Sequence, residues 1–433
     1  MPHNLYYIDS IYQQEENDLS EGYITLISTD ADENGRYIPA TIPFTRIPHV
    51  IDDEGNSMVA TENTYVYLRN YEQGGEIRLE NGNNSQYALL QFQQMADLRQ
   101  RLHAKYGDMT DSLTKDEYFI LAHPTEIYSY HVNVGHGNCT FIIIISGNRH
   151  LVWMVDSSVL EARWMTKNFI DHKSDLDCCI RDIASILKIR IRDLHINRFF
   201  LTHPHYDHYN GIFYLRNKGL MDDETVYYIN YYFDCSNEWL HDFLEELYQT
   251  NARIVEPISS KGIWPFILIL HPECRIYKKG DVASSVDVSP KREISNVNNS
   301  SVVYDFFIGC RTMVFPGDLQ LYGFNKMSKV SGCCNMPQNP DYYAISHHGS
   351  GNGHPFQKCQ SNKYGYPIVC MAYNAKKAIL MGKDGVYSGI FHKDVIRFFN
   401  HHSKLETTDM VSGPTILKYL RLNWLTGQVL YEF

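Results

Sequence analysis

The sequence predicts a layered α/β fold preceded by a smaller β-rich unit. From about residue 126 onward, short apolar stretches typical of strands come close together, with helix-like stretches between them. Apolar residues make up 44% of the 433 residues, which is enough for a large core in one or two domains. No repeat of fixed period runs through the chain. We therefore expect sheets that are covered by helices.

The first part of the chain predicts short strands followed by one helix. The strand-like runs are Gly22 to Ser28, Thr64 to Leu68 and Glu76 to Leu79, with polar turn clusters between them. Ser85 is a plausible N-cap and Gly107 a plausible stop for the helix that follows. Residues 108–118 are polar and predict a connector. We expect residues 1–125 to form a β-rich extension or small domain whose role the sequence does not reveal.

The second part, residues 126–433, carries most of the predicted strands. They are Ser129 to Val134, Thr140 to Ile145, His150 to Val155, Ile196 to Thr202, Tyr227 to Phe233, Arg253 to Ile258 and Trp264 to Leu270. Helices are predicted near Leu176 to Ile189 and over Trp239 to Gln249.

Four potential metal ligands fall within six positions after one of these strands. The segment reads Thr-His-Pro-His-Tyr-Asp-His over residues 202–208. His203 and His205 alternate by two and can point the same way, while Asp207 and His208 follow on the turn. Imidazole suits zinc, iron and manganese, and carboxylate binds the same ions. Chance surface histidines are a poor explanation, because histidine is scarce in ordinary compositions.

Three further strands are predicted to end in polar groups that can bind or support a metal. Val152 to Asp156 and Val314 to Asp318 each end in a carboxylate, and Ala344 to Ser350 contains the pair His347 and His348. Each signal is weak alone, because an aspartate after a strand more often caps a turn or helix.

In this order and spacing, the segments resemble the metallo-β-lactamase superfamily. Six short segments of the chain are similar to motifs of the hydrolase domain in ComEC-type competence proteins: Val134-Gly-His-Gly-Asn138, Leu270-His-Pro272, Asn298-Asn-Ser-Ser301, Pro316-Gly-Asp318, His347-His-Gly-Ser350 and Gly389-Ile-Phe-His392. The resemblance covers residues 126–433 and implies a four-layer αββα sandwich with ligands on loops at one edge.

The resemblance also implies two divalent metal ions, of which zinc and manganese are the expected kinds. His203 and His205 would hold one ion. Asp207 and His208 would hold the second, and Asp318 would bridge the two.

The remaining ligands are less certain from the resemblance. His347 or His348 would complete the second site, and we favour His347 because it lies nearer the predicted strand end. Asp156 would support the ligands without binding metal itself. Asn298 to Ser301 stands where many superfamily members supply another histidine to the first metal. That site is therefore expected to be open, weakly occupied or completed by water, unless His271 contributes.

Five residues are candidates for catalysis or for contact with the substrate. Asp207 would orient hydroxide or pass a proton, and His392 would contact the oxyanion or protonate the leaving group, unless it simply begins a helix. His136 and Asn138 stand where the ComEC-type hydrolase domains often have glutamine and aspartate, respectively. His136 would bind substrate or metal, or bond to backbone in a tight turn. Ser350 would offer its backbone N–H to a phosphate oxygen.

The resemblance favours a metal-dependent phosphodiesterase or nuclease that acts on nucleic acid or a nucleotide. The alternatives are a hydrolase of a small ester, lactone or phosphocholine-like group, and a metal-bound interaction module in which residues 1–125 recruit a protein partner. Tyr206 and Tyr209 flank the metal segment and either stack on a base or pack in the core. A net charge of −11 disfavours tight binding of long duplex DNA.

Composition and the termini favour a cytoplasmic protein. The ten cysteines include no CxxC pair, which is typical of reduced thiols. The first residues lack the pattern of a signal peptide, and no apolar run is long enough to span a bilayer. We therefore expect no association with a membrane.

Overall fold

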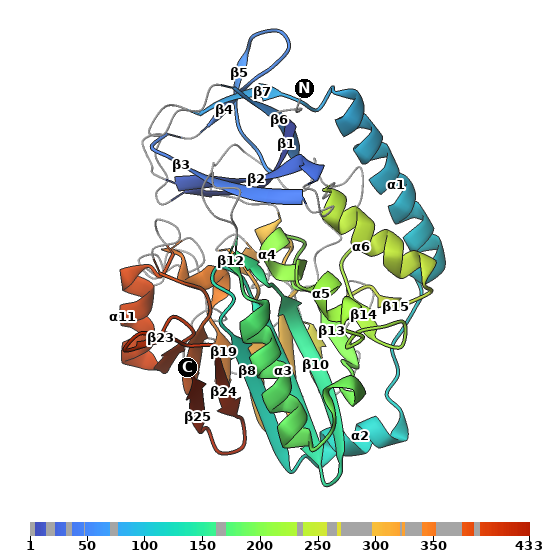
Figure 1. Cartoon of the computed structure of the whole chain (residues 1–433), viewed down its shortest axis with the longest axis vertical. Coiled ribbons are helices and arrows are strands. Elements are labelled where there is room, and N and C mark those ends of the chain that lie inside the picture. The colour runs from blue at the N-terminus through green and yellow to red at the C-terminus, as the bar shows by residue number, and fades with distance from the viewer. Residues whose placement is uncertain are drawn as a thin grey trace.

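The protein is a mixed α/β structure with several sheets, shown as a computed structural model in Figure 1. The structure describes residues 5–13, 22–31, 37–46, 48–69, 77–161, 170–231, 237–257, 266–269, 297–320, 323–324, 340–351, 375–384 and 390–433. Part of the predicted fold class is thereby confirmed, since the described residues form several sheets together with helices.

The N-terminal part forms a seven-stranded sheet with the order β3-β2-β1-β6-β7-β4-β5. Its strands are β1 (Leu5–Gln13), β2 (Gly22–Ala31), β3 (Tyr37–Phe44), β4 (His49–Ile51), β5 (Ser57–Val59), β6 (Thr64–Arg69) and β7 (Arg78–Asn81). Side chains alternate across β1, so that Tyr7 joins the main core of the molecule and Ile8 joins a separate apolar cluster within the sheet. The predicted β-rich unit is present.

Two helices follow this sheet, where we predicted one. In α1 (Gln86–Tyr106), the Ser85 side chain accepts a hydrogen bond from the Ala88 N–H, so the predicted N-cap is confirmed. The second helix, α2 (Lys115–Ala122), begins inside the segment predicted to be a connector. Thr114 and Glu117 form a reciprocal capping box there. The polar composition of residues 108–118 therefore marked the start of a helix and misled the prediction.

The largest sheet has eight strands in the order β15-β14-β13-β10-β9-β8-β24-β25. Its strands are β8 (Glu126–Val132), β9 (Cys139–Ser146), β10 (Arg149–Ser157), β13 (Arg198–Phe200), β14 (Val226–Tyr228), β15 (Arg253–Val255), β24 (Tyr419–Asn423) and β25 (Val429–Glu432). The strands from β10 to β15 pair in parallel. Helices α3 (Lys173–Leu187), α4 (Tyr206–Tyr209), α5 (Ile212–Asn217) and α6 (Glu238–Gln249) occur between these strands in the chain.

A six-stranded sheet has the order β16-β17-β18-β19-β20-β21. Its strands are β16 (Ile267–Ile269), β17 (Tyr304–Ile308), β18 (Arg311–Phe315), β19 (Tyr342–Ala344), β20 (Lys377–Leu380) and β21 (Lys404–Thr407). The strands from β18 to β21 pair in parallel. Helix α11 (Lys393–His402) contacts β21. Two short strand pairs complete the described strands: β11 (Leu160–Glu161) with β12 (Ile170–Asp171), and β22 (Val411–Ser412) with β23 (Thr415–Ile416).

Aromatic side chains join the eight- and six-stranded sheets. The ring of Phe306 on β17 lies 5.2 Å from Phe200 on β13 and 5.8 Å from Trp153 on β10. Edge-to-face and tilted pairs at such distances stabilise a core beyond the area that they bury. A separate apolar cluster, which includes Tyr343 and Phe399, packs α11 onto the six-stranded sheet.

The N-terminal sheet shares the main core with the rest of the chain. Tyr65 on β6 packs against Phe92 on α1, and the hydroxyls of Tyr65 and Tyr87 both contact the Glu238 carboxylate on α6. Figure 1 shows this sheet above the ends of the other two sheets, beside α6. Among the described residues, no helix is long and apolar enough to cross a membrane.

Candidate metal centre

The predicted metal ligands meet where parallel strands of both large sheets end. From the eight-stranded sheet, β10 leads to Asp156 and β13 leads to the segment 202–208. From the six-stranded sheet, β18 leads to Asp318 and β19 leads to the short 3₁₀ turn Ser346–Gly349. The carboxyl ends of parallel strands are a common place for sites in α/β proteins, because loops from several strands converge there.

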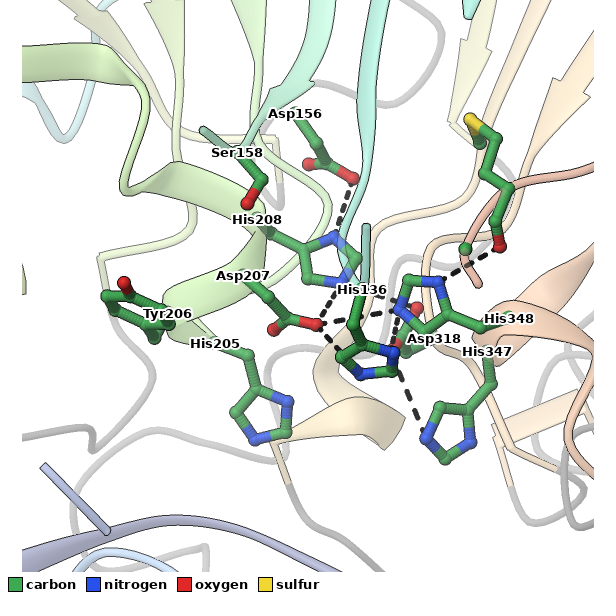
Figure 2. A network of polar contacts seen from close by, with 12 residues as sticks. His136, Asp156, Ser158, His205, Tyr206, Asp207, His208, Asp318, His347 and His348 are labelled. Atoms are coloured by element: carbon green, nitrogen blue, oxygen red, sulfur yellow. Dashed lines mark hydrogen bonds and ion pairs between the residues drawn. The ribbon is translucent and has the colours of Figure 1, made fainter. Parts of the chain in front are cut away.

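Four of these residues form one compact group of ligand atoms. Asp207, His208, Asp318 and His348 each offer one atom, and all four atoms lie within 4.8 Å of one another. The Nε2 of His348 lies 3.5 Å from Oδ2 of Asp207 and 3.5 Å from Oδ2 of Asp318. The Nε2 of His208 lies 3.4 Å from Oδ1 of Asp318 (Figure 2).

Buried atoms of this group make no hydrogen bond within the described part of the chain. They are Nε2 of His208, Nε2 of His348 and Oδ1 of Asp318. Buried polar atoms normally have hydrogen-bond partners, so three such atoms that face one another need a different explanation. Two imidazole nitrogens and two carboxylates are a donor set that fits a divalent cation such as zinc or manganese.

The outward ring nitrogens of the two histidines are anchored. Asp156 Oδ2 lies 2.8 Å from Nδ1 of His208, and the carbonyl of Met381 lies 3.2 Å from Nδ1 of His348. Asp156 also accepts hydrogen bonds from the backbone N–H and the hydroxyl of Thr202. A partner on the outward nitrogen fixes the tautomer and ring orientation of a metal-binding histidine. Asp156 thus occupies the supporting position that we predicted for it.

His203 and His205 lie beside this group but outside it. The Nε2 of His203 is 3.1 Å from Nδ1 of His205, and the rings of His203 and His208 are 4.1 Å apart. The hydroxyl of Thr202 anchors Nδ1 of His203 at 3.1 Å. The structure therefore brings the two predicted ligand pairs into adjacent positions, with one nitrogen of each histidine turned toward its neighbour.

Charge in the four-residue group is balanced between two histidines and two aspartates. Burial alone would lower the pKa of His348, but Asp318 and Asp207 raise this pKa to about 9. His208 behaves in the same way, since burial opposes its charge while nearby carboxylates raise its pKa well above the usual value. Burial opposes ionisation of Asp318, but His348 and His208 hold its pKa well below the ordinary range. A bound cation would take the place of the protons on these imidazoles, because a metal-binding histidine is neutral.

His203 and His205 carry no such positive charge. Burial and the neighbouring His208 hold the pKa of His203 well below its usual value. Burial also lowers the pKa of His205 to about 4. Both imidazoles are therefore neutral at neutral pH, which is the form that binds a metal.

The geometry favours His348 over His347, against our prediction. His347 Nε2 is 3.9 Å from Asp318 Oδ2, while its Nδ1 contacts the Ser350 hydroxyl at 2.9 Å. Both histidines have left-handed backbone, with φ of 49°. Distance from the predicted strand end was a poor guide, because two successive left-handed residues turn the second histidine back into the group. Such strain costs about 1–3 kcal/mol per residue and tends to occur at functional sites.

His136 lies against the group. Its Nε2 is 3.3 Å from Oδ2 of Asp207, and its ring centroid is 4.2 Å from that of His348. The next residue, Gly137, has φ of +140°, and a Cβ there would lie 2.7 Å from the Asp207 carbonyl oxygen. Glycine is thus required where this loop approaches Asp207. Of the roles open to His136, this placement favours contact with metal or substrate.

Ser350 is placed differently from our prediction. Its backbone N–H donates to the carbonyl of His347, so it is not available to a phosphate oxygen. Asn138 is buried, donates its backbone N–H to the Asp207 carbonyl, and lines a cavity of about 10 Å³ with Asp156 and Thr202. The predicted contact of Asn138 with a substrate stays a prediction.

His392 begins helix α11 as its N-cap. The ring Nδ1 of His392 accepts a hydrogen bond from the backbone N–H of Asp394 at 3.3 Å. The backbone N–H of His392 donates to the carbonyl of Gly349. The helix-start interpretation is therefore confirmed, and the backbone bond places His392 next to the turn that carries His348. Its role in catalysis stays a prediction.

The two tyrosines of the metal segment pack in the core. Tyr206 lies 4.9 Å from the Trp239 ring, and the Tyr209 hydroxyl donates to Asn237. Both are buried, which removes them from stacking on a substrate. Among the other predicted positions, Leu270 to Pro272, with His271, and Gly389 lie outside the described residues.

The loop that carries His136 packs against His172 and its carboxylate partner Glu161. His172 lies 3.2 Å from carboxylate oxygens of both Glu161 and Asp175. A Cβ at Gly135, where φ is +67°, would lie 2.1 Å from Glu161 Oε2. Burial would lower the pKa of His172, but hydrogen bonds with Asp175 and Glu161 raise it above the usual value.

Exposure shows from which side the centre can be reached. The side chains of His208 and His348 are fully buried, whereas Asp207 is 17% exposed and His136 is 11% exposed. A ligand from solvent would therefore approach over Asp207 and His136.

Two acidic residues of the N-terminal sheet reach the centre, and sequence reasoning missed both. Asp9 Oδ2 accepts a hydrogen bond from the Tyr206 N–H, and Glu62 Oε2 lies 4.0 Å from His205 Nε2. Neither residue stands in a motif, so no sequence signal distinguishes it from other carboxylates in the strands and turns of this sheet.

Comparison with known proteins does not add a relative. A scan against models of protein families gives no match. A search of curated proteins finds none with significant similarity.

Proposed function

We propose that the protein is a metal-dependent hydrolase that cleaves phosphodiester bonds of a nucleic acid or nucleotide. The observation that carries this proposal is the group Asp207, His208, Asp318 and His348, with ligand atoms within 4.8 Å and two outward nitrogens anchored. Anchored histidines beside carboxylates are the arrangement that catalytic metal sites need, because the ligands are held in place before the ion arrives.

We further propose that residues 126–433 have the four-layer αββα arrangement of the metallo-β-lactamase superfamily, nearest to the hydrolase domain of ComEC-type proteins. Two observations support this. Aromatic contacts join the eight- and six-stranded sheets, and α3 and α11 contact β8 and β21, one strand from each sheet. The described segments that resemble the family's motifs, including residues 316–318 and 347–350, converge near one edge of these sheets.

The centre would hold two divalent ions, zinc or manganese. Asp207, His208 and His348 would hold one, His203 and His205 the other, and Asp318 would lie between them. When bound, such ions lower the pKa of bound water toward about 7 and neutralise charge on the phosphate.

The protein's own residues would complete the chemistry. The carboxylate of Asp207, whose side chain is 17% exposed, would hold a proton from the attacking water. His136, whose Nε2 lies 3.3 Å from Oδ2 of Asp207, would orient Asp207 or contact the substrate. His392 keeps its Nε2 free of the helix cap, which uses Nδ1, and this nitrogen is our candidate donor to the leaving oxygen.

Cationic side chains in a groove near the centre support a phosphodiester over a small neutral ester. An open groove of about 660 Å³ runs along α11, and its lining includes Phe391, Lys393 and Arg397 together with one carboxylate, Asp384. The groove adjoins the centre, because the Phe391 N–H donates to the carbonyl of His348. Successive cationic side chains at helical spacing suit the phosphates of a short single strand, even in a protein whose net charge is −11.

The proposal is tested by metal content and turnover. Purified protein is analysed for bound metal and assayed with bis-p-nitrophenyl phosphate and short single-stranded oligonucleotides, in the presence of Mn²⁺ or Zn²⁺. We expect turnover that is lost in Asp318→Asn and His208→Gln, because both remove ligands of the group. His103→Gln is the matched control, since His103 is exposed on α1.

Other outcomes have distinct meanings. Turnover of small esters or lactones alone would replace the substrate class and keep the metal centre. Bound metal without any turnover would favour an interaction module, with a protein partner bound through residues 1–125. Absence of bound metal at saturating Zn²⁺ and Mn²⁺ would refute the proposed function.

A further inference from the structure

The N-terminal sheet contributes two buried carboxylates to the loop that carries the predicted ligands. Asp9 on β1 accepts a hydrogen bond from the backbone N–H of Tyr206, 197 positions away in the chain. Glu62, just before β6, has an 8% exposed side chain, and its Oε2 lies 4.0 Å from Nε2 of His205. The sheet therefore contacts two successive residues of this loop.

Glu62 is held in this position by the sheet itself. Its Oε1 accepts a hydrogen bond from the backbone N–H of Ile11 at 3.2 Å, and its Oε2 lies 4.0 Å from Nε2 of His205. The sheet is in turn seated on the rest of the molecule, since Tyr65 belongs to the main core and Tyr23 packs against Ile390. The approach of Glu62 to His205 is thus fixed by packing on both sides.

His205 is oriented in the opposite sense to four of its neighbouring histidines. In His203, His208, His347 and His348, Nδ1 contacts an oxygen of Thr202, Asp156, Ser350 and Met381 respectively. In His205, Nδ1 faces Nε2 of His203 at 3.1 Å, and Nε2 faces Glu62. Figure 2 shows His205 at the margin of the network, on the side away from Asp156.

The outward nitrogen of His205, Nε2, makes no hydrogen bond with the described residues. The Glu62 carboxylate of the N-terminal sheet lies 4.0 Å from it. A buried negative charge beside one ring nitrogen favours the tautomer with the proton on that nitrogen. For His205 this tautomer leaves the lone pair on Nδ1, the atom that faces His203.

We propose that Glu62 is a positioning residue of the metal centre: it holds the proton of His205 on Nε2 and so makes Nδ1 the ligand atom for the first metal. This inference rests on the proposed function for the identity of the ligand. It assigns to residues 1–125 a part in the centre itself, in addition to any partner that they recruit. The carboxylate comes from the sheet that resemblance to the family did not cover.

The 4.0 Å separation determines how Glu62 acts. The distance is longer than a direct hydrogen bond, so Glu62 influences His205 through its charge in a buried setting. Removing the charge while keeping the shape, as in Glu62→Gln, is therefore the informative change. Glu62→Asp keeps the charge and draws it back by one methylene.

The first test uses metal binding by the full chain. Zn²⁺ is titrated into metal-free protein against a chromogenic chelator, and two binding steps are fitted. We expect Glu62→Gln to weaken one step by about ten- to a hundredfold and to leave the other unchanged, and Glu62→Asp to restore most of the loss. Glu54→Gln is the control, because Glu54 is exposed in the turn between β4 and β5 of the same sheet.

The second test reads the tautomer without metal. The ¹⁵N resonances of the His205 ring, assigned by their loss in His205→Gln, report which nitrogen carries the proton. We expect a proton on Nε2 in the unaltered protein, and on Nδ1 or on both nitrogens in exchange in Glu62→Gln. Unchanged ring resonances together with unchanged zinc binding would overturn the inference.

The two proposals fail in different ways. If the protein binds no metal, the proposed function is wrong, while the ring resonances still decide whether Glu62 sets the tautomer. If the protein binds two ions and Glu62→Gln binds both with unaltered affinity, the centre stands and the role of Glu62 is refuted. A loss of both steps together with a lower unfolding midpoint in both Glu62 variants would show a purely structural role and would also refute it.

Discussion

Replacing Asp156 by asparagine should damage metal binding much more than folding. Asp156 is fully buried, and its carboxylate contacts Nδ1 of His208 and accepts two hydrogen bonds from Thr202. Asparagine has the same shape. It keeps an oxygen for the Thr202 N–H, but it presents an NH₂ group where Oδ2 accepted hydrogen bonds.

The expected change in stability follows from opposing effects. Two hydrogen bonds to a charged group would cost about 3–6 kcal/mol of unfolding free energy if nothing replaced them. The amide can instead donate to the Thr202 hydroxyl and to a neutral His208. Burial also raises the pKa of Asp156, so the ionised carboxylate is itself disfavoured in the folded protein, and asparagine removes that cost. We expect a net loss below about 2 kcal/mol.

No new hydrogen bond of asparagine offsets the expected loss of metal affinity. With metal on Nε2, the Nδ1 of His208 must carry its proton and needs an acceptor, which the amide NH₂ of asparagine is not. We expect affinity to fall by about ten- to a hundredfold, which corresponds to about 1.4–2.7 kcal/mol. Asp156 is a more diagnostic position than a proposed ligand such as Asp318, because its proposed role is only to orient His208.

The assay pairs Zn²⁺ titration with urea denaturation of the metal-free protein. Asp116→Asn is the matched control, since Asp116 is an exposed carboxylate on α2 whose partner is Arg149. Unaltered zinc affinity in Asp156→Asn, with the protein folded, would refute the reasoning that the Asp156–His208 contact orients a ligand.

Three further outcomes are expected. His348→Asn should weaken zinc binding at the four-residue group more than His347→Asn does, because Nε2 of His348 lies closer to Asp318; an equal or reversed effect in titrations would contradict this. His172→Gln should lose more stability at pH 6 than at pH 9 in urea denaturation. The pKa of His172 is raised in the folded protein. Its contribution to the free energy of unfolding is therefore complete below its pKa in the unfolded chain, about 6.5, and is lost as pH rises through its pKa in the folded protein. Lys393→Glu with Arg397→Glu should raise KM for oligonucleotides severalfold and leave turnover of bis-p-nitrophenyl phosphate unaltered; equal effects on both substrates would exclude α11 as a strand-binding face.

Local spacing was enough to predict the cluster of candidate ligands between residues 203 and 208. His203, His205, Asp207 and His208 lie within six positions, so the chain itself keeps them together once the preceding strand forms. The Ser85 N-cap was predictable for the same reason, because a cap and its N–H donor are three residues apart. The strand-end position of Asp156 followed from the apolar run before it.

Other features depended on how distant segments pack. The choice of His348 over His347 came from two left-handed residues in succession, a backbone path that the residue types do not announce. Ser350 was expected to offer its backbone N–H to a phosphate oxygen, but in the folded turn this N–H donates to the carbonyl of His347.

The sequence by itself determined the types and order of the candidate ligands and the strands that carry them, because these depend on interactions between near neighbours in the chain. The tertiary structure alone brought Asp318 and His348 to Asp207, and placed Glu62 beside His205. Contacts between residues more than a hundred positions apart exist only after two sheets have buried their apolar faces against each other. No local pattern records which turn of the N-terminal sheet then lies over the centre.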